Sequence, residues 1–196
     1  MSIQNKMQDL KKELLLQEAS KMFEELGYEH MKVADLAKTA HVSVGTIYAM
    51  FTSKEGLYLA YIERQIQEFL VELHKKTDSL KSAQEKIRIF VELKFSYYAQ
   101  KKKAIEKSAT NNPLFFNTLA QEHSEAFEKI YLFLQECFIE LNPQIDTQKA
   151  KRLSFAFNGF SDGYISLWLE KGDNLLQYTD EVCEFFTNML RRGHCQ

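Results

Sequence analysis

A short stretch near the N-terminus carries side chains that could bind a nucleic acid. Ser43 and Thr46 are hydroxyl residues, Tyr48 follows them, and Lys54 adds a positive charge. Hydroxyl, phenol and ammonium groups donate hydrogen bonds to phosphate oxygens, and a threonine can also contact a base edge through its hydroxyl or methyl. Gly45 has no side chain and would allow its backbone to come close to a groove. The stretch therefore indicates contact with DNA.

Each of these residues also has an ordinary structural interpretation. Ser43 can simply cap a helix, and Gly45 can be a tolerated helix glycine. Tyr48 can be buried, whereas Thr46 and Lys54 can be solvated surface residues. Both interpretations remain open from the residue types alone.

The elements around this stretch form the outline of a helix-turn-helix. Apolar residues with helical spacing predict an amphipathic helix over about 7–26, with Gly27 as its C-cap. The same spacing predicts a short helix over about 33–40 and a second one that Ser43 caps and Phe51 ends. A tight turn at His41 separates the two short helices.

A long helix should follow. Thr52 and Glu55 have the spacing of a capping box, in which the Thr52 hydroxyl accepts from the Glu55 amide, and an apolar face continues to about residue 76. Further helices are predicted at about 82–101, 112–140, 146–170 and 174–192. We expect an all-α protein with a three-helix DNA-binding head at 1–53, joined by the long helix to a helical body at 54–196.

Composition narrows the function classes. With 25 Lys and Arg against 27 Asp and Glu, the net charge is −2, so contact with DNA must depend on local geometry. The three cysteines are widely spaced, which favours reduced cytosolic thiols over a redox sensor and indicates neither a disulfide framework nor a zinc site. We expect a cytoplasmic protein that does not bind membranes, because no long apolar run or signal peptide is present.

An enzyme is the main rival class. No Glu-x-x-His pair, His-Glu-x-x-His motif or glycine-rich nucleotide loop occurs, so di-iron, metalloprotease and nucleotide chemistry lack their residues. We therefore expect no catalytic residue, no metal and no cofactor.

Residues 33–57 resemble the DNA-binding head of the TetR family of bacterial regulators, and the resemblance extends over about 8–60. Its most specific parts are residues 43–48, Phe51, and residues 53–55. The resemblance implies a homodimeric, sequence-specific transcriptional regulator, expected to be a repressor, that binds a palindromic operator in double-stranded DNA. The residues that it places at the DNA are Lys32, Ser43, Val44, Gly45, Thr46, Tyr48 and Lys54.

The chain also departs from the family pattern. Ala34 and Met50 stand where the family commonly has polar residues that touch DNA. His41 replaces a turn glycine and must adopt the turn geometry at some cost. Lys32 stands where Thr or Ser is common, and could replace a hydroxyl contact by a charged one.

By the same resemblance, the body dimerises and binds a small-molecule effector, which we expect to be apolar or aromatic. Its aromatic residues support a pocket, for which the candidates are Phe69, Phe90, Tyr97 and Tyr131, although ordinary core packing explains them too. The dimer interface is expected on the last two helices. Its candidates are Gly159, Gly163, Trp168, Phe185, Phe186 and Met189, with Trp168 equally suited to the core.

The lysines at 101–103 are expected to form a solvated helix end, where cations suit the helix dipole. The alternative to a ligand-responsive regulator is a structural DNA-associated or adaptor protein that uses the same head without a ligand. Only a sensor would lose affinity for DNA when a small molecule is added.

Overall fold

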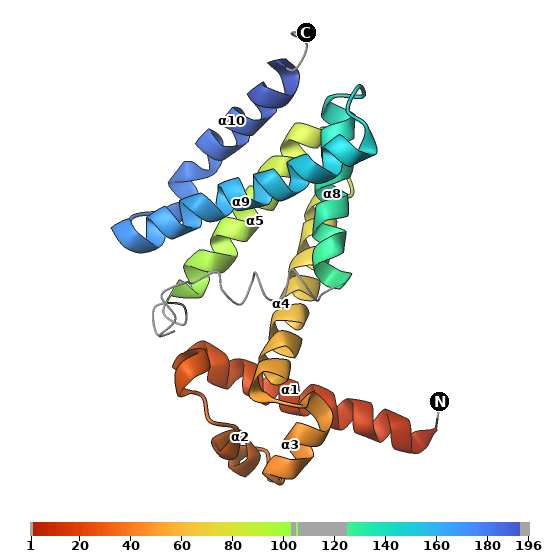
Figure 1. The fold of residues 1–196 in the computed structure, drawn as a ribbon, viewed down its shortest axis with the longest axis vertical. Coiled ribbons are helices and arrows are strands. Elements are labelled where there is room, and N and C mark those ends of the chain that lie inside the picture. The colour runs from red at the N-terminus through yellow and green to blue at the C-terminus, as the bar shows by residue number, and fades with distance from the viewer. Residues whose placement is uncertain (1, 103–104, 106–124, 193–196) are drawn as a thin grey trace. The chain divides into compact units, whose positions relative to one another are not determined.

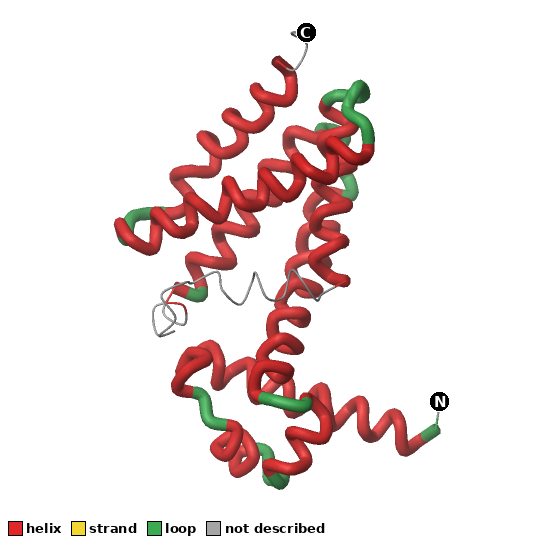
Figure 2. Tube along the Cα trace, viewed as in Figure 1, coloured by secondary structure: helices red, strands yellow, loops and turns green. Residues whose placement is uncertain are grey.

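The computed structural model describes residues 2–102, 105 and 125–192. These residues form helices joined by short loops, and the described part of the chain contains no strand (Figure 2). The all-α prediction is confirmed.

Two compact units divide the described residues. The head unit comprises the residues up to 65 together with 101–102 and 105, and the body unit comprises 66–100 and 125–192. Helix α4 (Lys54–Thr77) contributes its first half to the head unit and its second half to the body unit.

The head unit contains three further helices, α1 (Ile3–His30), α2 (Val33–Thr39) and α3 (Val44–Phe51), labelled in Figure 1. Helix α2 packs against both α1 and α3. The core of the unit is made of apolar side chains with at most 5% exposure, among them Leu15, Ala19, Phe23, Leu36, Ile47, Phe51, Leu57 and Tyr61. This core holds α3 against the rest of the head.

Gly27 interrupts helix α1 at the position where the sequence predicts its C-cap. Gly27 has a φ of 76° and a ψ of 167°, which kinks the helix, but one more turn follows before Met31. The amide of Met31 then donates to the Gly27 carbonyl at 3.2 Å. Glycine takes this positive φ without the steric cost that a side chain would add.

Helix α4 begins one residue later than the capping-box pattern predicts. Its cap is the Ser53 hydroxyl, which accepts from the Gly56 amide at 3.0 Å. Thr52 instead ends α3, with a φ of 67° and its amide donating to the Tyr48 carbonyl at 2.8 Å. The assignment of the cap to Thr52 was therefore wrong, because this residue turns the chain.

The body unit contains α5 (Ala83–Gln100), α8 (Glu125–Leu141), α9 (Thr147–Lys171) and α10 (Thr179–Arg192). Helix α8 packs on α9, and α5 packs on α8 and α10. The helix predicted at 174–192 is interrupted, because a 3₁₀ turn, η1 (Leu175–Tyr178), precedes α10. Of the helix predicted at 112–140, residues 112–124 lie outside the described residues.

The body core is rich in phenylalanine. Phe157 contacts Phe138, Phe186 and Phe90, with ring centroids 5.8, 4.6 and 6.1 Å away. Phe90 and Phe138 are at most 1% exposed. Much of the aromatic content of the sequence is therefore used in packing the body.

Lys101 is not part of a solvated helix end. Its ammonium pairs with the Glu24 carboxylate, donates to the Tyr61 hydroxyl at 3.2 Å and lies 5.4 Å from the centre of the Tyr61 ring. Its side chain is 17% exposed. The prediction was wrong for this lysine because the partner on α1 is remote in sequence, and Lys103 lies outside the described residues.

Candidate nucleic-acid interface

Helix α3 has one buried and one exposed face. Ile47 and Phe51 are at most 5% exposed and anchor the helix in the head core. Val44 and Tyr48 are 37% and 43% exposed, and Gly45 beside them is exposed as well. Tyr48 is therefore a surface residue rather than a core one, and α3 presents Val44, Gly45 and Tyr48 on its outer face.

Ser43 caps this helix. Its hydroxyl accepts from the Thr46 amide at 3.0 Å and lies 2.9 Å from the Thr46 hydroxyl. The capping interpretation of Ser43 is thus correct, and the pair of hydroxyls sits at the start of α3. A helix start carries free amides and a partial positive charge, both of which suit a phosphate.

The turn before α3 is a Schellman motif. The His41 amide donates to the Lys38 carbonyl at 3.2 Å, and the Val42 amide donates to the Ala37 carbonyl at 2.9 Å. His41 occupies the left-handed position of the motif, with a φ of 53°. The expectation that His41 adopts the geometry of a turn glycine is confirmed.

Gly45 and Gly56 differ in what surrounds them. A Cβ at Gly45 would meet only the Ser43 hydroxyl oxygen, at an ordinary 3.6 Å. A Cβ at Gly56 would lie 2.1 Å from the Phe51 carbonyl oxygen. The fold therefore requires a glycine at 56 but not at 45, where the open space lies on the outer face of α3.

Lys54 is the first residue of α4, and its ammonium packs on an aromatic ring. Its ammonium lies 4.5 Å from the centre of the Tyr28 ring and 3.4 Å from the Glu29 carbonyl oxygen. The Tyr28 hydroxyl donates to Glu55 at 2.8 Å. Hydrogen bonds from its own backbone amide and from Tyr28 lower the pKa of Glu55. The lysine is half-buried, so its charge is fixed at the N-terminus of α4.

Three further head positions are Lys32, Ala34 and Met50. Lys32 is exposed at the N-cap of α2 and makes no side-chain cap bond there. Ala34 is exposed and Met50 is half-exposed, so neither places a polar group at the surface. Lys32 and Lys54 are the cations of the predicted set, and the ammonium of Lys12 lies 5.5 Å from the centre of the Phe51 ring on α3.

Two of the four candidate pocket residues, Phe69 and Phe90, contact each other. Phe69 and Phe90 are in edge-to-face contact, with centroids 5.7 Å apart, and Phe90 is only 1% exposed. Tyr97 contacts the ring of Tyr98. Tyr131 stacks on Phe155 at 4.0 Å, and burial, followed by the charge of Asp162, raises its pKa to about 12. A role for these residues in ligand binding stays a prediction.

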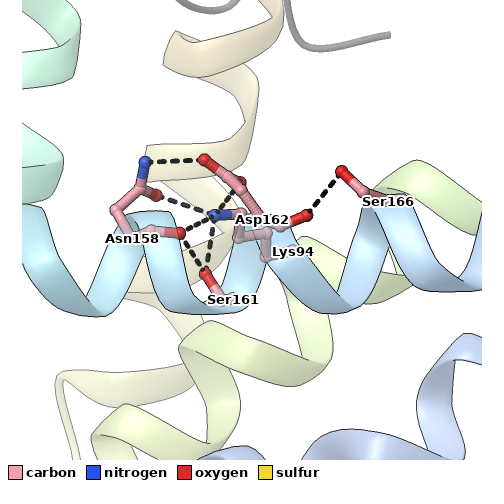
Figure 3. A network of polar contacts seen from close by, with 5 residues as sticks. All are labelled: Lys94, Asn158, Ser161, Asp162 and Ser166. Atoms are coloured by element: carbon pink, nitrogen blue, oxygen red, sulfur yellow. Dashed lines mark hydrogen bonds and ion pairs between the residues drawn. The ribbon is translucent and has the colours of Figure 1, made fainter. Parts of the chain in front are cut away.

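A buried polar network in the body was not predicted (Figure 3). The Lys94 ammonium on α5 lies 2.6 Å from the Asp162 carboxylate on α9, and donates to the Asn158 side chain at 2.7 Å and to the Ser161 hydroxyl at 2.8 Å. Burial lowers the pKa of Lys94, whereas the Asp162 carboxylate acts in the opposite direction. The burial of Lys94 could have been predicted from the sequence. Lys94 lies seven residues after Ile87, and this spacing places it on the apolar face of α5.

The candidate residues of the dimer interface fall into a buried group and an exposed group. Trp168 and Phe186 are 3% and 4% exposed within their own chain, so both belong to the body core and Phe186 is not the surface residue that was expected. Phe185 and Met189 are 58% and 42% exposed. The remaining two are exposed glycines of α9 with no neighbouring atom within 4 Å of an added Cβ, namely Gly159 and Gly163.

The described residues also bear on membrane spanning and on metal binding. None of the helices there combines the length and apolar character needed to cross a membrane. The same residues contain no group of three or more His, Cys, Asp or Glu side chains arranged to hold a metal ion.

Residues 15–61 match the family model of bacterial regulatory proteins of the tetR family. The HTH-type transcriptional repressor ComR of Escherichia coli K12 is 43% identical over 54 residues, which are 28% of this chain and 26% of that protein. The HTH-type transcriptional regulator SAB2452 of Staphylococcus aureus is 25% identical over 167 residues, covering 84% of this chain and 90% of the other.

Solved structures share the fold. The fatty acid degradation regulator FadR of Bacillus halodurans superposes with a TM-score of 0.67 at 21% identity, over 92% of this chain and 96% of that one. FadR of Bacillus subtilis, in complex with stearoyl-CoA, has a TM-score of 0.65 at 19% identity, over 88% and 96% of the two chains. At these identities the likeness concerns the fold.

Proposed function

Because the chain is a transcriptional regulator of the TetR family, we propose that it is a repressor whose helix α3 reads a palindromic operator. The observation that carries the proposal is the outer face of α3, where Val44, Gly45 and Tyr48 are exposed opposite a buried anchor. A recognition helix needs such a face to enter the major groove. We assign DNA contact to Lys32, Ser43, Val44, Gly45, Thr46, Tyr48 and Lys54.

The contacts divide by chemistry. Lys32 and Lys54 carry charge beside α3 and would bind phosphates. Thr46 and Val44, at the start of α3, would contact base edges and thymine methyl groups. Gly45 would let the helix backbone come close to the DNA.

A homodimer would place two heads on the two halves of the operator. The exposed residues of α9 and α10, which are Gly159, Gly163, Phe185 and Met189, support a joining surface in the body. Two-fold symmetry in the protein requires an approximate palindrome in the DNA, with half-sites about 34–36 Å apart or at a multiple of that spacing. Selection from random duplexes should return such sites, and enrichment of non-palindromic sites alone would contradict the proposal.

The effector that we propose is a small molecule with an apolar part, bound in the body unit and releasing the operator. The phenylalanine-rich body supports this, as does the stearoyl-CoA bound by the similarly folded FadR of Bacillus subtilis. A ligand shifts DNA binding only by its difference in affinity for the two states, typically about 1–3 kcal/mol. Operator DNA must therefore weaken effector binding by the same factor.

Calorimetry tests this reciprocity. Acyl-CoA thioesters of increasing chain length would be titrated into the protein with and without operator. We expect weaker binding to the operator complex. If every thioester bound equally well with and without operator, acyl-CoA thioesters would be ruled out as effectors. If no small molecule released the protein from DNA, the alternative of a structural or adaptor protein would be favoured.

Salt dependence of operator binding tests the DNA contacts. Replacing Lys54 by Gln should weaken binding to all duplexes and reduce the slope of log affinity against log salt by about 0.9 for each phosphate group that the variant no longer neutralises. Lys38→Gln is the matched control, because Lys38 pairs with Asp35 at 3.6 Å on the exposed side of α2 and its side chain is 81% exposed. Equal slopes for wild type and Lys54→Gln would remove Lys54 from the interface.

A further inference from the structure

The first turns of α1 carry an apolar stripe that the described residues leave exposed. Ile3, Met7, Leu10 and Leu14 are 79%, 66%, 60% and 57% exposed. The head core begins only afterwards, at Leu15, which is 3% exposed. Four large apolar residues on one short helical segment form a larger apolar patch than scattered surface residues do.

The spacing of the stripe indicates a helical partner. Successive residues lie four, three and four positions apart, which is the alternation of a coiled-coil seam. The seam is narrow, because polar residues such as Lys6, Gln8 and Lys11 fill the positions around it. A helix that packs on a globular core has a broader apolar face.

We propose that residues 3–14 of α1 pair antiparallel with the same segment of a second copy of this chain. In that arrangement Ile3 lies in a layer with Leu14 of the second copy, and Met7 lies in a layer with Leu10 of the second copy. The pairing is two-fold symmetric, so each apolar residue of the stripe is covered by one from the other copy.

Charge complementarity selects the second copy and the antiparallel direction. Lys6 and Glu13 occupy equivalent positions on one flank of the seam. Antiparallel helices bring Lys6 of one copy next to Glu13 of the other, whereas parallel helices bring Lys6 next to Lys11. Glu13 pairs with Arg64 at 2.6 Å, yet its side chain is 59% exposed and can accept from a second cation.

The seam is only two heptads long, so the pairing is weak on its own. It becomes effective when another association already brings two copies together, because the second contact is then intramolecular. Binding to neighbouring DNA sites provides such an association, and the seam would then make that binding cooperative. The pairing itself does not depend on which bases α3 reads.

Cysteine cross-linking of the full chain tests the pairing and its direction. The background is Cys195→Ser, since Cys137 and Cys183 are buried and free. Met7→Cys and Leu10→Cys would be made separately and also co-expressed, then oxidised while bound to a duplex that carries two adjacent operators. We expect a cross-link between the two different variants and none within either preparation alone, because only the Met7–Leu10 layer brings the two Cα atoms within disulfide reach.

Two results would overturn the proposal. Cross-links within each single preparation would show parallel helices, and no cross-link in the co-expressed sample would show that the segments do not meet. Neither result concerns operator recognition, which is measured separately on a single site.

A charge placed in the seam provides a second measurement. Met7→Glu should abolish cooperativity between two adjacent operators while leaving the affinity for one operator unchanged. Gln8→Glu adds the same charge outside the seam and should retain cooperativity. Equal cooperativity in the two variants, or a wild type that binds two sites independently, would contradict the proposal.

Discussion

Gly56 packs directly against the carbonyl of Phe51, so that a Cβ at position 56 would lie 2.1 Å from the Phe51 carbonyl oxygen. Thr52, which follows Phe51, has a φ of 67°, and the Ser53 amide donates back to the Phe51 carbonyl at 2.7 Å. The end of α3 and the start of α4 are thus joined by a very tight turn. Because that turn sets where Lys54 stands relative to α3, its geometry bears on the whole candidate interface.

We therefore expect Gly56→Ala to destabilise the protein. The added methyl group meets backbone, which cannot move aside as a side chain can, and overpacking of this kind costs about 1–3 kcal/mol or more. Urea unfolding measured by circular dichroism gives the change. An unfolding free energy within about 0.5 kcal/mol of wild type would show that the turn can relax.

Gly45→Ala should stabilise the fold but weaken binding to the operator. The position is in a helix and has room for a methyl group, so alanine should raise the free energy of unfolding by about 0.5–1 kcal/mol. Affinity for the operator should fall, because the methyl group lies where α3 approaches the DNA. If operator affinity were unchanged, Gly45 would be an ordinary helix glycine.

His41→Gly should stabilise the head. A residue with a side chain in the left-handed region destabilises the fold by about 1–2 kcal/mol. Glycine removes this strain but has more conformational entropy in the unfolded chain, so the expected net gain in unfolding free energy is at most about 1 kcal/mol. The control is Thr39→Gly, at an exposed position in the last turn of α2, which should lose about 0.3 kcal/mol because glycine has a lower helix propensity than threonine. Thermal unfolding of the two variants should shift in opposite directions.

Lys94→Met should be strongly destabilising, by about 3–5 kcal/mol, because it leaves the Asp162 carboxylate without its cation in the body. The double variant Lys94→Met, Asp162→Leu removes both charges and should recover most of the loss. A double-mutant cycle from urea unfolding measures the coupling. Additive losses would mean that the two side chains do not depend on each other.

Alkaline pH should weaken the fold through two buried thiols. Burial raises the pKa of both Cys137 and Cys183 from 9.0 to about 12. Since the folded-state pKa is the higher one, their contribution to stability is complete below pH 9.0 and is lost as the pH rises toward about 12. The fall in unfolding free energy between these pH values should be smaller in Cys137→Ala than in wild type. If the unfolding free energy fell equally in both proteins, the pKa of Cys137 would not be raised by folding.

Local pattern was enough to predict the helix-turn-helix. The apolar spacing indicated α2 and α3, and the hydroxyl of Ser43 indicated the start of α3, because caps and helix periodicity depend on neighbours within a few residues. The left-handed conformation of His41 was predicted from the turn alone. The exposure of Tyr48 followed only once Ile47 and Phe51 were seen to form the buried side.

Contacts between distant segments could not be predicted in the same way. Nothing near Lys101 in the sequence indicates that it pairs with Glu24, and nothing near Lys94 indicates Asp162. Trp168 had two equally good interpretations until its indole nitrogen was found to donate to the Asp173 carbonyl at 2.8 Å inside the body. The cap at Ser53 was missed because Thr52 has a backbone conformation that residue type does not reveal.

The buried position of Trp168 gives the molecule a built-in optical reporter. It is the single tryptophan of the chain, and it lies in the body unit, whereas the aromatic cluster of the head around Phe23 consists of phenylalanine and tyrosine rings, including Tyr28, Tyr58 and Tyr61. Light absorbed selectively by the indole therefore produces emission from one unit alone. The change in that emission and the decrease in helical signal during heating would coincide if head and body melt together, and would separate if the head melts first.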